Sequence, residues 1–302
     1  MTNPFLFDII FNPLIENGAF KKEYVNQEKE NLTKILFSRQ DNKSLYAKDR
    51  CIEEMFENEP YSLYKYGSPD KINEINEKNL YEYYKKLIAN SKIDLFISGE
   101  NIENVKIPNI DSHELENITI KHNAHTNPKI VKENLDVTQG KLIIGLNTPE
   151  EDKLAVSLYN TILGGGANSK LFQNVREKAS LAYSAGSSYI RRQNTILVQT
   201  GIEIANYDKA LEIIKQQIQE MKNGNITNDE FNAAKELLIS SVNLIPESEE
   251  DTIAFYFDQR LFGDNLTITE YAEKLKNVTM EQVIDVAQKV SIDTIYFLKK
   301  GE

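Results

Sequence analysis

The sequence predicts an α+β fold in two parts, and three observations carry that prediction. Short apolar runs that end at glycine or polar residues, such as residues 141–146, are typical of strands. Longer stretches with the apolar spacing of helices separate these runs. The chain turns polar and loses its periodicity over residues 100–126, which indicates a linker. We therefore expect residues 1–99 and 127–302 each to form a largely antiparallel sheet with helices packed on it.

The first part is predicted to be mainly helical and to close with one strand. Its helices are expected over residues 5–11, 21–50, 52–58 and 79–90. Asn12-Pro13 ends the first helix, and residues 60–69, with their prolines and tyrosines, predict a loop. The apolar run at residues 93–99 stops at Gly99 and predicts the strand.

The second part mixes strands with long helices. Strands are expected at residues 141–146, 182–190, 195–203 and 295–298, and helices at residues 152–163, 169–178, 207–223 and 227–244, with more helix after them. Three consecutive glycines, Gly164, Gly165 and Gly166, break the helix that precedes them, because glycine tolerates backbone conformations closed to other residues. This mixture excludes a helical bundle and an all-β fold.

Charge and composition exclude several kinds of partner. The net charge is −11 over 302 residues, and the acidic and basic residues are interspersed. A nucleic-acid partner is excluded because no basic stripe is present to bind phosphates. The single cysteine, Cys51, cannot form an intrachain disulfide and fits a reducing compartment. With no signal-peptide pattern and no apolar run of membrane length, we expect a cytoplasmic protein with no membrane partner, and the abundant Lys, Asn and Ile suggest a bacterial source.

One stretch of the second part carries a specific signature. Residues 163–172 read Leu-Gly-Gly-Gly-Ala-Asn-Ser-Lys-Leu-Phe, and Arg176 and Tyr183 follow at a spacing of seven. The glycine turn, the Ser-x-Leu-Phe helix and the Arg/Tyr spacing together resemble the second domain of insulinase/pitrilysin-type zinc peptidases. The resemblance implies a complete second domain at residues 127–302.

The first part agrees with the same family. Its segments Asn12-Pro13-Leu14, Gly18-Ala19-Phe20 and Tyr64-Lys65-Tyr66-Gly67 are similar to the back half of the family's first domain. The resemblance covers nearly the whole chain and is strongest to bacterial, zinc-less members encoded beside an active homologue. It implies that residues 1–99 are a truncated first domain and that residues 100–126 link it to the second.

The zinc motif of the active members is absent. They carry His-x-x-Glu-His on a helix, where two histidines bind zinc and the glutamate polarises the attacking water. This chain has three histidines, His113, His122 and His125, all in or beside the predicted linker. His122-Asn123-Ala124-His125 has no glutamate between its histidines, so we interpret the pair as solvated linker residues and not as a metal site.

The third zinc ligand of the family also lacks a counterpart. If Glu28 matches the first of two glutamates on the family's helix, Ile35 occupies the ligand position, and isoleucine cannot bind a metal. A shifted alignment on Glu23 and Glu30 restores the glutamate but not the histidines. We therefore predict no catalytic residue, no metal ligand and no cofactor in this chain, with zinc expected only in a partner.

The predicted substrate-binding residues are Arg176, Tyr183, Gly164, Gly165 and Gly166. The resemblance implies that the Arg/Tyr pair reaches the zinc site of a facing domain, where guanidinium and hydroxyl donate to a peptide carbonyl and to the developing oxyanion. Alternatively, Arg176 pairs with Glu177 and Tyr183 simply packs in a strand. The glycines predict a tight turn adjoining substrate, since no Gly-Lys-Ser/Thr follows them as in a phosphate loop.

Three functions are compatible with this pattern. The first is a non-catalytic subunit that pairs with a zinc-bearing insulinase-type homologue, or associates with itself, and completes a peptide substrate site. The second is a peptide-binding or scaffolding protein with no catalytic role. The third is a fragment of a metallopeptidase gene, because Met1 falls inside the predicted first domain.

Overall fold

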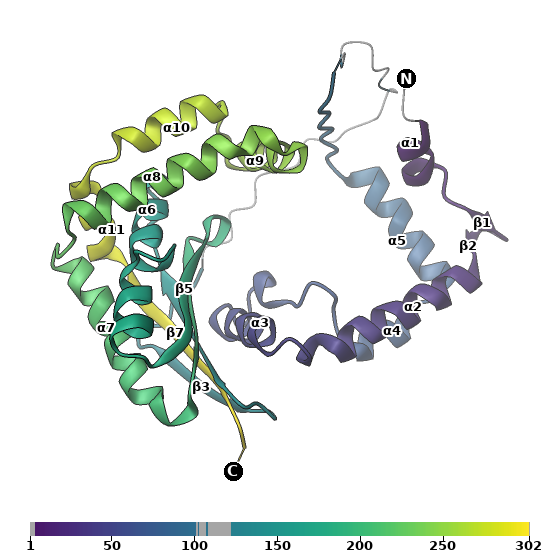
Figure 1. Cartoon of the computed structure of the whole chain (residues 1–302). Helices are drawn as coiled ribbons and strands as arrows, with labels where there is room; N and C mark the ends of the chain where they lie inside the picture. The colour runs from purple at the N-terminus through teal and green to yellow at the C-terminus, as the bar shows by residue number, and fades with distance from the viewer. Residues whose placement is uncertain (1–3, 101, 103–106, 108–121, 302) are drawn as a thin grey trace. The chain divides into compact units, whose positions relative to one another are not determined.

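The computed structural model describes residues 4–100, 102, 107 and 122–301, and it divides into two compact units (Figure 1). Unit 1 comprises Met1–Gln40, Tyr64–Lys121 and Glu249–Asp258, and unit 2 comprises Asp41–Leu63, His122–Ser248 and Gln259–Glu302. Most of the linker predicted at residues 100–126, with His113, lies outside the described residues. The division into residues 1–99, 100–126 and 127–302 stays a prediction.

Unit 1 is built from helices and one small hairpin. Its elements are α1 (Pro4–Phe11), β1 (Ile15–Glu16), β2 (Ala19–Phe20), α2 (Lys22–Phe37), α4 (Pro69–Glu74) and α5 (Glu77–Asn90). The hairpin turns through Asn17 and Gly18, both at positive φ, as a two-residue hairpin turn requires. Phe20 then lies edge-on to Tyr81 and Tyr84, with ring centroids 5.3 and 5.5 Å apart, and so attaches the hairpin to α5.

Three predictions for the first part are wrong. The helix expected over residues 21–50 is interrupted after α2, and α3 (Lys43–Met55) begins behind Asn42, whose side chain caps it by accepting from the backbone N–H of Leu45 at 3.0 Å. The separate helix at residues 52–58 is the end of α3, which stops at Phe56. The strand expected at residues 93–99 is absent, because no described strand lies beside this run to complete a ladder of hydrogen bonds.

Unit 2 contains a five-stranded sheet with the order β3-β7-β4-β6-β5. The strands are β3 (Lys129–Asn134), β4 (Gly140–Asn147), β5 (Ala182–Ile190), β6 (Thr195–Ile202) and β7 (Ser291–Lys299). All neighbours pair antiparallel except β3, which runs parallel to β7. The predicted α+β class with a largely antiparallel sheet is therefore confirmed.

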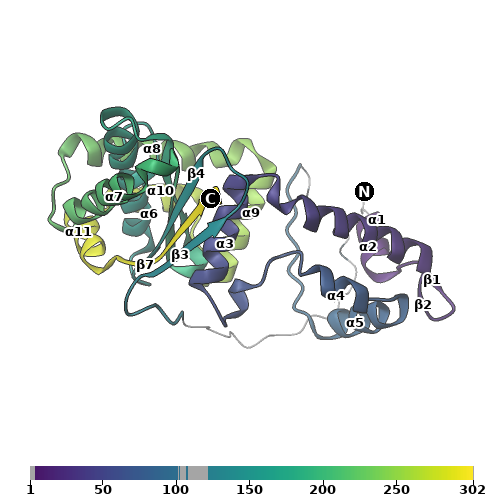
Figure 2. The ribbon, with the colours of Figure 1, turned by 90° about the horizontal axis from the view of Figure 1, so that it is seen from below.

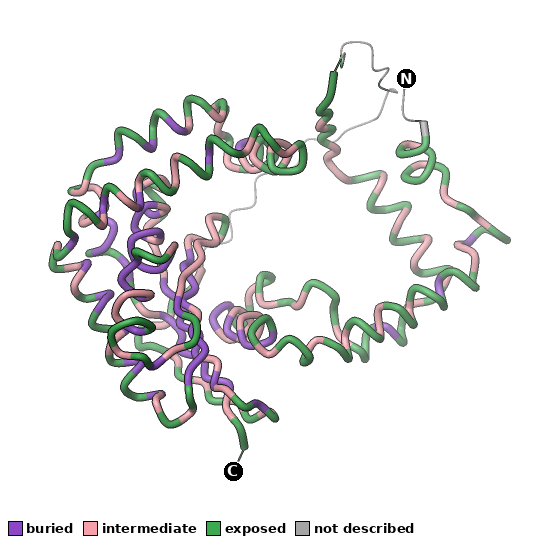
Figure 3. Tube along the Cα trace, in the orientation of Figure 1, coloured by how far each residue is buried: buried purple, intermediate pink, exposed green. Residues whose placement is uncertain are grey.

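Helices cover both faces of this sheet (Figure 2). Besides α3, the helices of unit 2 are α6 (Lys153–Gly164), a π-helical segment (Phe172–Lys178), α7 (Tyr207–Lys222), α8 (Asn228–Leu244), α10 (Ile268–Asn277) and α11 (Met280–Lys289), whereas most of α9 (Glu249–Phe262) belongs to unit 1. Successive side chains of a strand point to opposite faces. Leu142 and Ile144 of β4 therefore join the large core with α6 and α7, while Ile143 packs with α3. Burial on both faces explains why β4 reads as an unbroken apolar run (Figure 3).

A polar network fixes α3 to the sheet. Glu133 of β3 accepts hydrogen bonds from the hydroxyls of Tyr46 and Tyr296 at 2.5 and 2.8 Å and from Arg50 Nε at 3.0 Å. Burial raises the pKa of Glu133, but these three donors outweigh burial and hold that pKa below its ordinary value. Cys51 of α3 is completely buried and packs against side chains of the sheet. Helix α3, encoded in the first part of the chain, is thus a structural element of unit 2.

Candidate substrate-binding surface

Arg176 lies on the π-helical segment that follows the glycine turn. Leu171 and Val175 are completely buried in the core and anchor this segment. The Arg176 side chain is 44% exposed, and its Nε lies 3.7 Å from Glu177 Oε1. Its guanidinium carbon lies 4.6 Å from the ring centroid of Phe172. The contact with Glu177 is therefore a loose ion pair that leaves the guanidinium accessible.

Tyr183 lies near the start of β5, the edge strand of the sheet as described. The pairing with β6 shifts register there: Ala182 lies opposite Ile202 and Ser184 opposite Gly201, so Tyr183 is the extra residue of a bulge. The tyrosine is 61% exposed and does not pack into the core. A bulge redirects a side chain away from the regular alternation of the strand, which accounts for this exposure.

The structure places the two predicted residues on neighbouring elements, because β5 packs against the π-helical segment. Each residue coincides with a backbone irregularity, a π-helical turn for Arg176 and a β-bulge for Tyr183. Both irregularities are over-represented at functional sites. The arrangement presents a cation and a phenol to solvent from a rigidly packed base.

The three glycines serve different purposes. Helix α6 ends at Gly164, as the sequence predicts, and the Gly165 N–H donates to the Thr161 carbonyl at 3.0 Å. A Cβ on Gly164 would lie 2.5 Å from the backbone nitrogen of Ser187, so α6 can approach β5 this closely only without a side chain. Gly166, in contrast, lines an open hollow beside α8. Gly164 is therefore a packing residue, whereas Gly166 borders accessible space.

Sequence reasoning missed a buried cluster around Asp293 of β7. His125 Nδ1 lies 2.9 Å from Asp293 Oδ1, and the His125 backbone N–H donates to Oδ2 at 2.9 Å. Asn147 Nδ2 donates to the same Oδ2 at 3.0 Å. On the other side of the cluster, His122 Nδ1 lies 2.8 Å from Glu59 Oε1. The interpretation of His122 and His125 as solvated linker residues is therefore wrong.

The cluster shifts the pKa values of Asp293 and His122. Burial raises the pKa of Asp293, but the nearby His122 and the hydrogen bonds from His125 and Asn147 outweigh burial and hold that pKa far below its ordinary value. Burial lowers the pKa of His122, but the carboxylates of Asp293, 3.5 Å from its Nε2, and of the hydrogen-bonded Glu59 raise that pKa above its ordinary value overall. Asp293 and His125 are 168 residues apart, so no local pattern could have revealed their contact.

The residues present do not fit the zinc site of active insulinase-type peptidases. Within the described residues, no group of three or more His, Cys, Asp or Glu side chains is arranged to hold a metal ion. In the Asp293 cluster the Nδ1 atoms of His122 and His125 are both engaged by carboxylates. Ile35, which an alignment on Glu28 puts at the third ligand position, lies on α2 and is 40% exposed.

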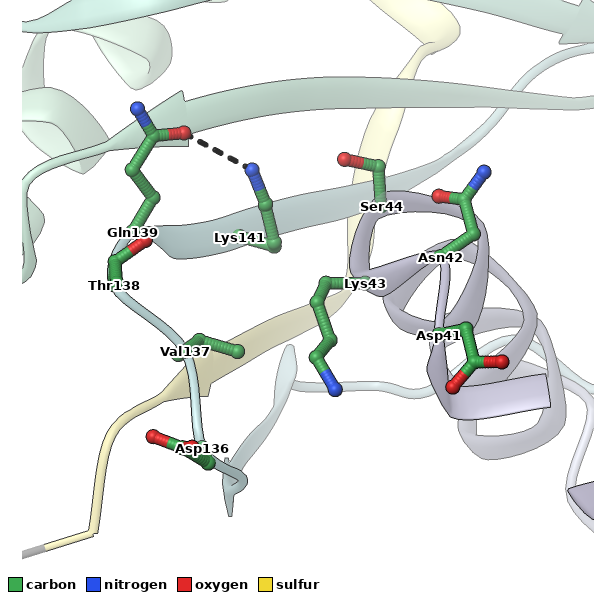
Figure 4. A pocket seen from close by; sticks show the side chains of 9 residues that line it. All are labelled: Asp41, Asn42, Lys43, Ser44, Asp136, Val137, Thr138, Gln139 and Lys141. Atoms are coloured by element: carbon green, nitrogen blue, oxygen red, sulfur yellow. Dashed lines mark hydrogen bonds between the residues drawn. The ribbon is translucent and has the colours of Figure 1, made fainter. Parts of the chain in front are cut away.

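A separate hollow of about 680 Å³ lies between the start of α3 and the connection from β3 to β4 (Figure 4). Asp41 and Asp136 line it together with Lys43 and Lys141, so its opposite charges balance. Lys141 Nζ donates to Gln139 Oε1 at 3.1 Å at its edge. None of the predicted substrate-binding residues lines it.

Helices of the described residues differ from membrane-spanning helices in length and composition. None of them combines the length and the apolar character that crossing a bilayer requires.

Comparison with known proteins agrees with the architecture. Among curated proteins, the chain is 34% identical over 308 residues to the "Probable inactive metalloprotease YmfF" of Bacillus subtilis. The matched region covers 98% of this chain and 72% of that protein. Among solved structures, a conserved protein from Enterococcus faecalis superposes with a TM-score of 0.87 at 26% identity, over 99% of this chain and 73% of that one. A peptidase M16 inactive domain from Pseudomonas fluorescens shares the fold with a TM-score of 0.73 at 18% identity, over 94% of this chain and 72% of that one.

A family profile gives the most direct assignment. The profile described as "Peptidase M16 inactive domain" matches residues 74–238, more than half of the chain and all of the glycine turn, Arg176 and Tyr183. The chain therefore belongs to the peptidase M16 family, as a homologue of its inactive type.

Proposed function

We propose that this chain is a non-catalytic subunit of a peptidase pair and completes the substrate site of a zinc-bearing M16 homologue. The observation that carries the proposal is the exposed Arg176 and Tyr183 on two packed, irregular elements. The missing zinc motif supports it, as does the similarity to a protein named an inactive metalloprotease. The given sequence lacks the zinc motif and contains Arg176 and Tyr183, the residues proposed here to contact substrate.

The two side chains act by donating hydrogen bonds to a bound peptide. A zinc ion held by the partner would supply an activated water for attack on the scissile carbonyl. The Tyr183 hydroxyl donates a hydrogen bond to a peptide carbonyl and so positions the substrate. The Arg176 guanidinium stabilises the oxyanion that develops. The buried residues Leu171 and Val175 hold the π-helical segment still, so little reorganisation is needed.

Reconstitution tests this function. The chain is purified alone and with a zinc-bearing M16 homologue of the same organism, and bound zinc and hydrolysis of a quenched peptide library are measured for each. We expect no zinc and no turnover from the chain alone, and turnover that rises when it joins its partner. Zinc and activity in the isolated chain would refute the proposal. Light scattering distinguishes a heterodimer from self-association of this chain.

A substitution then tests the role of Arg176 within the pair. Arg176→Ala should lower kcat/KM by roughly 2–4 kcal/mol of transition-state stabilisation, as for loss of one oxyanion donor. Lys178→Ala is the matched control, because it removes an exposed cation from the same π-helical segment. Normal turnover by the Arg176→Ala pair would rule out the shared site.

A second function is favoured by one observation. β5 is the edge strand of the described sheet and pairs only with β6, so its other edge can accept an extended peptide as an added strand. On this alternative the chain binds or scaffolds peptides without affecting catalysis. Peptide binding that persists while the partner's turnover is the same with and without this chain would favour it.

A further inference from the structure

The Gly166 turn and helix α8 enclose a hollow of about 400 Å³ in unit 2, within the size range of ligand pockets. The hollow is open because small residues line it from both sides, among them Gly166 and Ala233. Its apolar wall comes from Ile162 and Leu237, and the Leu237 side chain is 45% exposed. The space can therefore take an apolar stem from outside.

Two carboxylates line this hollow, and they differ in what balances them. Glu230 accepts from Lys170 Nζ at 2.8 and 3.0 Å and from the backbone N–H of Thr227 at 2.9 Å. Burial raises the pKa of Glu230, but the hydrogen bond from Lys170 outweighs burial and holds that pKa below its ordinary value. The charge of Glu230 is therefore already balanced by Lys170. Glu236 is exposed, and among the described residues it has no cationic partner.

We infer that this hollow is a pocket for an arginine or lysine side chain of a bound peptide, with the stem against Leu237 and the cationic end at Glu236. Charge complementarity selects this occupant, because the one unbalanced charge of the hollow is negative and the chain as a whole carries −11. An acidic side chain would meet repulsion there. The identification of this peptide as a protease substrate rests on the proposed function, but the binding itself does not.

A pair of matched peptides tests the pocket on the isolated chain. One is a labelled hexapeptide of Ala and Gly with a single central arginine, and the other replaces that arginine by citrulline, which has nearly the same shape but no charge. Binding is followed by fluorescence anisotropy at low ionic strength. We expect the arginine peptide to bind about threefold more tightly, as suits a solvent-exposed ion pair.

Three variants assign that preference to the pocket. Glu236→Gln should abolish the difference between the two peptides, whereas Glu212→Gln, which removes an exposed carboxylate from α7, should leave it intact. Ala233→Phe fills the hollow and should weaken both peptides at least about tenfold, with circular dichroism confirming the fold. Equal binding of the two peptides to the unmodified chain, or a preference that survives in Glu236→Gln, would overturn the inference. Because no partner is needed, this outcome is independent of the Arg176 turnover test.

Discussion

Gly164→Ala is the substitution for which the structure gives the clearest magnitude. The added Cβ would lie 2.5 Å from Ser187 N and 2.8 Å from the carbonyl carbon of Gly186. These are backbone atoms of β5, so they cannot swing aside as a side-chain tip can. Overpacking of this kind lowers the free energy of unfolding by up to about 3 kcal/mol. Replacing a glycine near a helix end by alanine raises it by up to about 1 kcal/mol. We expect a net loss of about 2 kcal/mol, or a fall in Tm of about 4–8 °C.

Thermal and urea unfolding measure this loss, and Gly166→Ala is the matched control. A Cβ at Gly166 would lie 3.1 Å from Leu237 Cδ2, the flexible end of a partly exposed side chain, so its stability should change by less than about 0.5 kcal/mol. Equal stability of the two variants would refute the packing role of Gly164. A variant that keeps full stability but impairs peptide turnover by the pair would show instead that Gly164 acts on substrate.

Three further predictions concern the buried groups of unit 2. Asp293→Ala leaves the hydrogen-bonding partners of a fully buried carboxylate unsatisfied and should lower the free energy of unfolding by roughly 3 kcal/mol in urea titrations; a loss below about 1 kcal/mol would contradict the described network. The pKa of His122 is raised in the folded protein, so protonation of His122 stabilises the fold fully below its ordinary pKa of 6.5, and this stabilisation is lost as pH rises through the folded-state pKa. The free energy of unfolding, measured from below pH 6.5 to above the folded-state pKa, should show this decline, and the decline should be missing in His122→Gln. Burial raises the pKa of Cys51, so Ellman's reagent should label the native thiol roughly a hundredfold more slowly than the denatured one, and rapid native labelling would contradict its burial.

The sequence predicts four of the five strands of unit 2, including the edge strand β5. β4 carries the apolar run of residues 142–146 and β6 the apolar run of residues 196–198, because α3 covers one face of the sheet and the large core covers the other. β3 was missed because its residues, Lys-Ile-Val-Lys-Glu-Asn, include two lysines and its Ile130 is 58% exposed. It is held in place by parallel pairing with β7, which lies far away in sequence. The break between α2 and α3 had a local signal, the capping residue Asn42, although strong helix formers such as Arg39 and Gln40 lie close to it.

The candidate site divides along the same line. Arg176, Tyr183 and the glycines lie within one continuous stretch, so a motif could identify them together. The bulge at Tyr183 and the hollow beside Gly166 depend on β6 and α8, which no motif within that stretch describes. The Asp293 cluster joins residues from distant parts of the chain and has no signature at all. Local chemistry is therefore predictable here, whereas chemistry that depends on long-range pairing is not.

The docking of α3 has a consequence for how such a chain can evolve. Unit 2 is discontinuous in sequence, since it takes Asp41–Leu63 from upstream of the linker region. A recombination event at residues 100–126 would transplant the sheet without α3 and bare the apolar face formed by Ile143, Leu197 and Tyr296. Such a product would be prone to aggregate. Unit 2 therefore cannot be exchanged by recombination at residues 100–126, and the segments before and after that junction must be inherited together.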